Sequence, residues 1–206
     1  MDEILPAPVP GAPLTSGSLA RLSLGVAARD VADFSRSIVP TGPPPRGGYG
    51  AALLADALRL QVLAERVLAA AVVAERLDGT EWDELAAETG ESPDATRERW
   101  QPAVASWERA VEHAAAFGGD PDTPRALAGP AAVAAALDRW VGFHREPGDP
   151  VLGEQAVTSG LQQMDPLREL LHLAAVRRLR DAAECSTADV TAREGALEQA
   201  IDRAPA

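Results

Sequence analysis

Residues 79–100 read GTEWDELAAETGESPDATRERW, and this stretch decides the predicted fold. Thr80 followed by Asp83 is close to a capping box, and acids in a first turn complement the positive end of the helix dipole. Gly90 can end that helix, because glycine adopts a left-handed conformation at little cost. The sequence therefore predicts a short helix at 81–89.

A second helix is predicted to begin after a turn of about three residues. Ser92 supplies a hydroxyl cap and Pro93 suits the first helical position, so we expect a helix at 93–100. Pro102 should then stop or kink this helix, and it suits the start of another at 102–117. Small or apolar residues are expected to face the junction of the first two helices: Leu85, Ala86, Ala95 and Trp100.

The stretch resembles a helix-turn-helix that recurs in actinobacterial regulators and small DNA-binding proteins. The shared pattern is Trp, any residue, Glu, a branched apolar residue, a turn with Gly, then Ala, and finally Arg-aromatic. The matching residues are Trp82, Glu84, Leu85, Gly90, Ser92, Ala95, Arg99 and Trp100. A helix predicted at 51–77 stands where the family has its first helix, so the resemblance covers 51–100. The sequence departs from the family at Glu91, where the family has an apolar residue, and it lacks the flanking basic residues.

The resemblance implies a small intracellular DNA-binding regulatory protein. In that case Ser92, Asp94 and Arg97 would face base edges, and Arg99 would orient the helix on the duplex. An arginine can bind guanine through two hydrogen bonds, which makes Arg97 the principal candidate for reading a base.

The charge of the same stretch supports an alternative function. Residues 78–91 contain six carboxylates and no basic residue, whereas the first helix of such a motif normally crosses the phosphate backbone. In the alternative, the chain is an acidic helical protein-interaction module that binds a basic partner and no DNA. Asp83, Glu84 and Glu88 are the candidate contact residues.

The composition argues against several other kinds of protein. The net charge is −12, and all 19 basic residues are arginine. Cys185 is the single cysteine, so an intrachain disulfide and a cysteine-based zinc site are excluded. The first residues are acidic where a signal peptide is basic, and the longest apolar run, Val67 to Ala74, is too short to span a membrane. We expect a cytoplasmic protein without membrane contact.

No pattern of catalytic or metal-binding residues is present. His113, His144 and His172 are too far apart in the sequence to form a two-histidine helical motif, and there is no lysine for a phosphate loop or a Schiff base. We therefore predict neither an enzyme nor a bound cofactor.

We predict an all-α fold, a helical bundle that contains the helix-turn-helix and carries a flexible N-terminal arm rich in Pro and Gly. The predicted domains are a mostly flexible arm with short helices at 1–50, the helix-turn-helix module at 51–117, and C-terminal helices that pack or form a homodimer at 118–206.

The apolar helix at 51–77 should be buried or lie at an oligomer interface. Poor order is expected for residues 1–17 and 40–50. Further helices are predicted at 18–39, 130–145, 151–163, 166–184 and 188–203, and a core stripe at Trp100, Val104, Trp107 and Val111.

Overall fold

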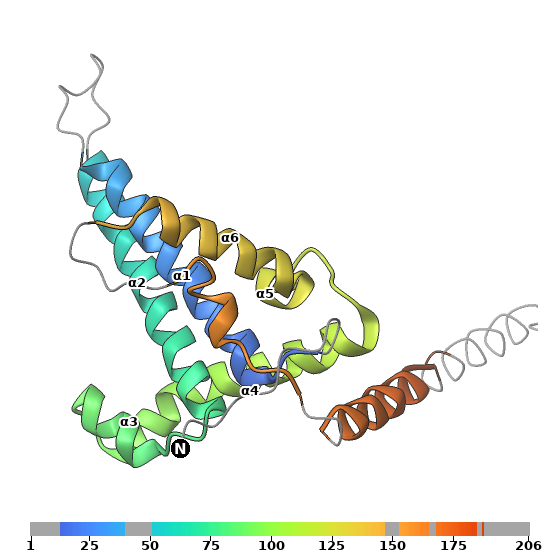
Figure 1. Ribbon diagram of the computed structural model, residues 1–206. Helices are drawn as coiled ribbons and strands as arrows, with labels where there is room; N and C mark the ends of the chain where they lie inside the picture. Colours follow the sequence, from blue (N-terminus) through green and yellow to red (C-terminus); the bar gives the residue numbers. More distant parts are fainter. Residues whose placement is uncertain (1–12, 40–50, 147–152, 165–167, 185–186, 188–206) are drawn as a thin grey trace, which may run out of the picture.

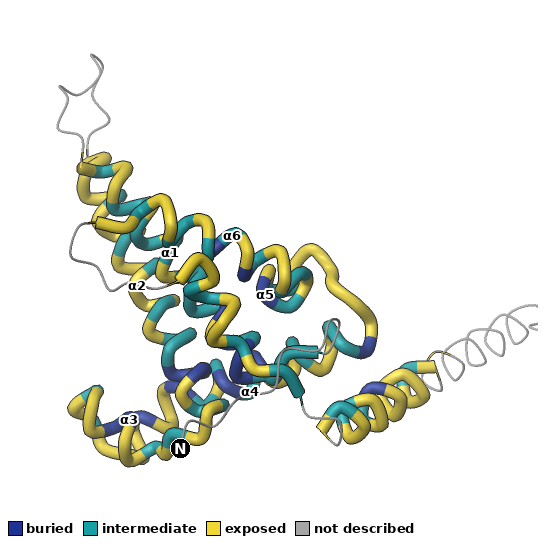
Figure 2. Tube along the Cα trace, viewed as in Figure 1, coloured by how far each residue is buried: buried dark blue, intermediate teal, exposed yellow. Residues whose placement is uncertain are grey.

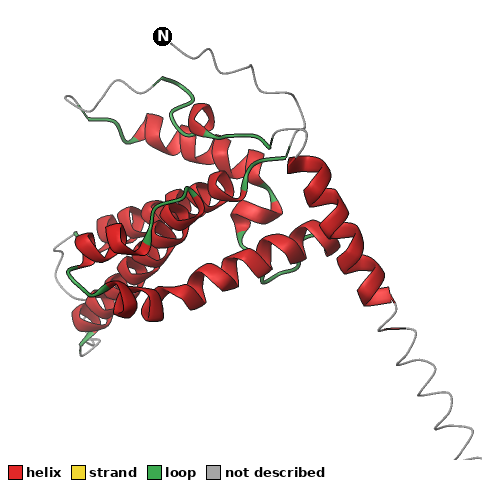
Figure 3. Ribbon diagram, turned by 90° about the horizontal axis from the view of Figure 1, so that it is seen from below, coloured by secondary structure: helices red, strands yellow, loops and turns green. Residues whose placement is uncertain are grey.

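The computed structural model describes residues 13–39, 51–146, 153–164, 168–184 and 187. These residues form helices and connecting loops, with one isolated bridge between Leu14 and Gln163 and no strand longer than that (Figure 3). The all-α class is therefore confirmed. The elements are α1 (Ser16–Ile38), α2 (Ala52–Leu77), α3 (Trp82–Thr89), α4 (Pro93–Phe117), α5 (Arg125–Ala128), α6 (Pro130–Phe143) and the 3-10 helix η1 (Thr158–Gly160). The predictions for 1–12, 40–50 and 188–203 lie outside the described residues. Poor order was also expected for 13–17, but Thr15 is the N-cap of α1, and Ser16 and Gly17 belong to this helix.

The fold is built around α1, which packs along α2 on one side and against α5 and α6 on the other (Figure 1). The hydroxyl of Thr15 accepts a hydrogen bond of 3.2 Å from the Ser18 amide and so caps α1. We predicted short helices at 18–39 within a mostly flexible arm, but α1 is a single helix of 23 residues that contains Gly25. A Cβ on Gly25 would lie 2.9 Å from Leu137 Cδ1, so this glycine permits the close approach of α6.

Helix α4 continues through Pro102, so the prediction that one helix ends here and another begins at 102 is wrong. The proline lacks the N–H that would bond to the carbonyl of Glu98, but this is one backbone bond in a helix of 25 residues. The buried side chains Trp100, Val104 and Trp107 stand on both sides of the proline and hold the two halves of α4 against the bundle.

The main core lies where α1, α2, α4 and α6 meet, and Figure 2 shows buried residues gathered there. Trp107 is buried in this cluster and Val111 packs against it, which confirms the predicted stripe. The buried members of the cluster are Ala20, Leu22, Val73, Ala74, Val104, Trp107, Ala126, Ala134 and Leu137.

The predicted helix at 151–163 is wrong for the described part, which forms turns at 154–157, η1 and a non-helical segment at 161–164. Asp138 on α6 accepts hydrogen bonds from the backbone amides of Val157 and Thr158, at 2.7 and 3.3 Å. The chain then pairs with the residues before α1, with Thr15 donating to the Gln162 carbonyl at 3.0 Å. These hydrogen bonds hold the segment against α6 and beside the start of α1.

Two helical surfaces are more exposed than their apolar composition suggests. On α2, which we predicted to be buried or at an oligomer interface, Leu53 is 81% exposed and Leu58 is 54% exposed. Residues 168–184, which lie within the predicted helix 166–184, are helical, and there Val176 is buried whereas Leu170 is exposed. No helix in the described ranges has the length and apolar character that crossing a membrane requires.

Candidate functional site

Helix α3 is held by a cap that lies one residue later than predicted. Glu81, not Thr80, is the N-cap, and the Glu84 carboxylate accepts a hydrogen bond of 2.9 Å from the Glu81 amide. Thr80 instead donates its hydroxyl proton to Glu75, at 2.7 Å. The hydroxyl of Thr80 therefore binds Glu75 at the end of α2 and does not cap α3. Glu84 has a structural role, because it caps the start of α3.

The turn between α3 and α4 has the chemistry that the sequence predicted. Gly90 ends α3 with a φ of 71°, in the left-handed region. Ser92 caps α4, its hydroxyl accepting a hydrogen bond of 3.2 Å from the Ala95 amide. Two helices joined by a short turn thus form a corner, and we call residues 81–100 the acidic corner.

The inner side of the acidic corner packs on α2. Leu85 and Trp100 form a small buried cluster with Val72, and the partly buried Trp82 lies against it. Leu85, Ala86 and Trp100 are 8%, 3% and 6% exposed, so their predicted burial is confirmed. Ala95 was also predicted to face the junction, but it is exposed.

The outer side presents the beginning of α4, where Ser92, Asp94 and Arg97 are all exposed. Arg97 forms no ion pair or hydrogen bond with any described residue, and Asp94 does not pair with it. The residues expected to face DNA bases are thus accessible on the first two turns of the helix.

Arg99 is bound by carboxylates. It forms ion pairs with Glu91 at 2.9 Å and with Glu65 of α2 at 3.7 Å, and its guanidinium lies over the ring of Trp100. Glu91 occupies the position where the resembled family has an apolar residue, and its Oε2 atom is buried without a hydrogen-bond partner among the described residues. No local sequence pattern indicated Glu65, because it reaches the corner only through the packing of α2 on α4.

The exposed surface of α3 is negatively charged. Asp83 and Glu88 are exposed and form no ion pair with a described residue, whereas Glu81 pairs with Arg76 at 3.5 Å. Residues 78–100 hold eight carboxylates against two arginines, and one of these arginines is already paired.

Apart from Arg76, which pairs with Glu81, and Arg21, which pairs with Asp78, three further arginines lie away from this surface. Arg59 stacks on Phe34 of α1, and Arg180 donates a hydrogen bond to the carbonyl of Ala116 at the other end of α4. Arg66 lines a pocket beside α1. The acidic corner therefore keeps a predominantly negative outer surface.

Among the described residues, no group of three histidine, cysteine or acidic side chains could hold a metal ion. The rings of His113 and His144 contact those of Phe117 and Trp140, respectively, in tilted arrangements. No protein-family model, curated protein or solved structure matches the chain.

Proposed function

We propose that this chain is a helical protein-interaction module whose acidic corner binds a basic surface of a partner protein. The observation that carries the proposal is the charge of the corner after its internal ion pairs are counted. Arg99 is neutralised by Glu91 and Glu65, while Asp83 and Glu88 remain exposed. A surface of one sign attracts a partner of the opposite sign and discourages polyanions.

DNA binding is the second candidate function, and the exposed Arg97 favours it. This side chain stands on the second turn of α4, next to the exposed Ser92 and Asp94, and has no partner within the described residues. If α4 entered a major groove, Arg97→Ala should weaken specific binding by about 1–3 kcal/mol, the value of one good base contact. Carboxylates on α3 oppose this function, because half or more of protein–DNA hydrogen bonds go to sugar and phosphate.

The test compares two charge-neutralised variants of the full chain. Asp83→Asn with Glu88→Gln removes two charges from the acidic corner without touching the Glu84 cap. Glu108→Gln with Glu112→Gln removes the same charge from the far half of α4, where both side chains are also exposed and unpaired among described residues. The probes are a fluorescent arginine-rich peptide and a fluorescent mixed-sequence DNA duplex, followed by anisotropy.

The corner variant should bind the peptide several-fold more weakly than the unchanged chain, since an exposed ion pair contributes about 0.2–1 kcal/mol. The Glu108 and Glu112 variant should keep nearly the original affinity. Equal losses in both variants would mean that only net charge matters and would contradict a docking site at the corner. Duplex binding that Arg97→Ala weakens would instead establish the DNA-binding function.

A further inference from the structure

A pocket of about 370 Å³ lies between α1, α2 and the start of α5, away from the acidic corner. We propose that it binds a small organic anion, a carboxylate or phosphate ester with a short apolar body. The volume falls within the range of small-molecule sites, about 300–1,000 Å³. The pocket is unrelated to the residues of the proposed function.

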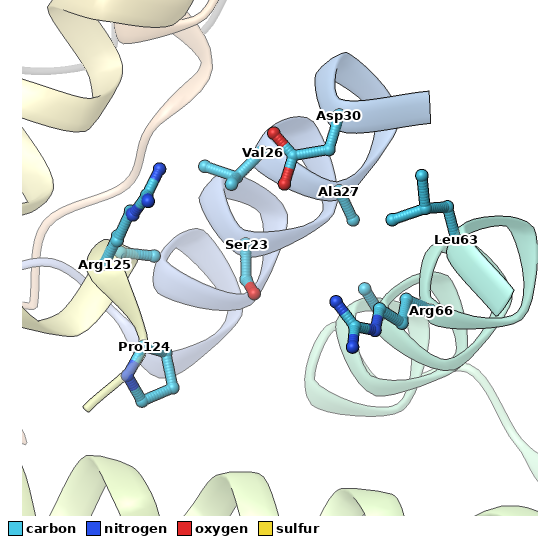
Figure 4. Close-up of a pocket in the computed structure, with 10 residues that line it drawn as sticks. Ser23, Val26, Ala27, Asp30, Leu63, Arg66, Pro124 and Arg125 are labelled. Carbon is cyan, nitrogen blue, oxygen red and sulfur yellow. The ribbon is translucent and has the colours of Figure 1, made fainter. Parts of the chain in front are cut away.

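Two arginines from different helices line the pocket, Arg66 of α2 and Arg125 of α5. Figure 4 shows them on opposite sides of α1, which runs through the middle of the view. Neither forms an ion pair or a hydrogen bond with a described residue. In a chain with 31 acids and 19 arginines, many arginines pair with a carboxylate, as Arg21, Arg29, Arg36, Arg76 and Arg99 do.

Among the described residues that line the pocket, Asp30 is the one carboxylate, and it pairs with Arg29 at 3.5 Å. The negative charge of Asp30 is therefore partly neutralised by Arg29, which does not line the pocket. The two guanidinium groups leave an excess of positive charge, and guanidinium binds carboxylate or phosphate oxygens through paired hydrogen bonds.

Ser23 provides a third polar group on the pocket wall. Two other serines of α1, Ser35 and Ser37, donate their hydroxyl protons to the carbonyls of Val31 and Phe34, at 2.8 and 2.7 Å. The Ser23 hydroxyl has no hydrogen-bond partner among the described residues, and Figure 4 shows its oxygen in the space between the two arginines. It is available to a ligand.

The remaining lining is apolar and gives space for a short hydrocarbon. It consists of Val26 and Ala27 of α1, Leu63 and Ala70 of α2, and Pro124 and Ala126. A ligand that satisfies both parts of the wall carries an anionic group and an apolar body, so a bare inorganic ion leaves the apolar wall uncovered.

The experiment uses the full chain labelled with ¹⁵N, titrated with hexanoate, hexyl phosphate, hexanol and inorganic phosphate. Hexanoate or hexyl phosphate should shift the amide signals of Ser23, Arg66 and Ala126, and a response to only one of them identifies the anionic group. Hexanol and inorganic phosphate should bind at least tenfold more weakly. An equal response to hexanol and hexanoate would overturn the proposal.

Two sets of variants locate the site. Arg66→Gln with Arg125→Gln should weaken hexanoate or hexyl phosphate binding at least tenfold, whereas Arg109→Gln with Arg139→Gln, an exposed pair away from the pocket, should not. Ala27→Leu keeps every charge and fills the apolar part of the pocket, so it should also block binding. Unchanged affinity in either the Arg66 and Arg125 variant or the Ala27 variant would refute the site.

Discussion

The hydroxyl oxygens of Thr89 on α3 and Thr96 on α4 lie 3.2 Å apart, on either side of the turn at Gly90. Thr96 is completely buried, and Thr89 is also 3.3 Å from the carbonyl of Ala86, to which its hydroxyl can donate. This pair of threonines therefore joins the two helices of the acidic corner by a hydrogen bond between their hydroxyl groups. The Thr96 hydroxyl is shielded from water.

Thr96→Val should lower the free energy of unfolding by about 1 kcal/mol, because it removes one hydrogen bond while keeping the shape of the side chain. Thr89 retains the Ala86 carbonyl as a partner, which limits the cost. Urea denaturation measures the change. A loss near zero would show that the threonine pair does not stabilise the corner.

Replacing either of two glycines by alanine should change the free energy of unfolding, but in opposite directions. Gly90 has a φ of 71°, and no atom lies within 4 Å of the place that a Cβ would occupy, so Gly90→Ala costs only backbone strain, about 1–2 kcal/mol. Gly142 lies in α6 with equally open space, and Gly142→Ala should stabilise by up to about 1 kcal/mol. Thermal melts of the two variants check both signs, and a stabilising Gly90→Ala would contradict the left-handed cap.

Trp107→Ala should destabilise the chain by about 3–5 kcal/mol, as expected for a large-to-small change in a core. Trp107 is 8% exposed and belongs to the main buried cluster. Denaturant unfolding monitored by circular dichroism gives the difference. A loss below about 1 kcal/mol would mean that the main core does not depend on this indole.

Asp138 should make the free energy of unfolding depend on pH in the acidic range. Burial raises the pKa of its carboxyl group, but hydrogen bonds from the Thr158 hydroxyl and from the amides of Val157 and Thr158 outweigh burial and bring the pKa below its ordinary value of 3.8. A carboxyl whose pKa is depressed by folding stabilises the fold above its unfolded pKa and loses that contribution as pH falls through the folded pKa. Asp138→Asn should therefore be less stable than the unchanged chain at neutral pH, and the gap should narrow in acid. Denaturation at a series of pH values tests this, and a constant gap would contradict the assignment.

The caps and turn of the acidic corner could be predicted because they depend on neighbouring residues. Gly90 and Ser92 act through the backbone within three residues of themselves, so their chemistry is visible in the sequence. The prediction at Pro102 failed for the same reason: the local effect of a proline is to break a helix, but Trp100 and Trp107 pack on both sides of it and override that effect. The role of Gly25 could not be predicted, because its spatial neighbour Leu137 is far away in the sequence.

The candidate sites depend more on distant contacts. The sequence indicated the acids of α3, but it did not reveal that Glu84 caps the helix or that Glu65 neutralises Arg99. The pocket could not be predicted, because Ser23, Arg66 and Arg125 come from three separate helices and no spacing relates them.

The missing backbone hydrogen bond at Pro102 falls at the boundary between two buried clusters. Trp100 belongs to the small cluster of the acidic corner, and Val104 belongs to the main core. Among the described residues, the buried hydrophobic cluster at the corner has three members and that of the main core has nine, so we expect the corner to have the lower free energy of local opening. The amide protons of α3, and those of α4 before Pro102, should consequently exchange with solvent deuterium sooner than the amide protons of α4 after Pro102. A single continuous helix would then show two different rates of exchange.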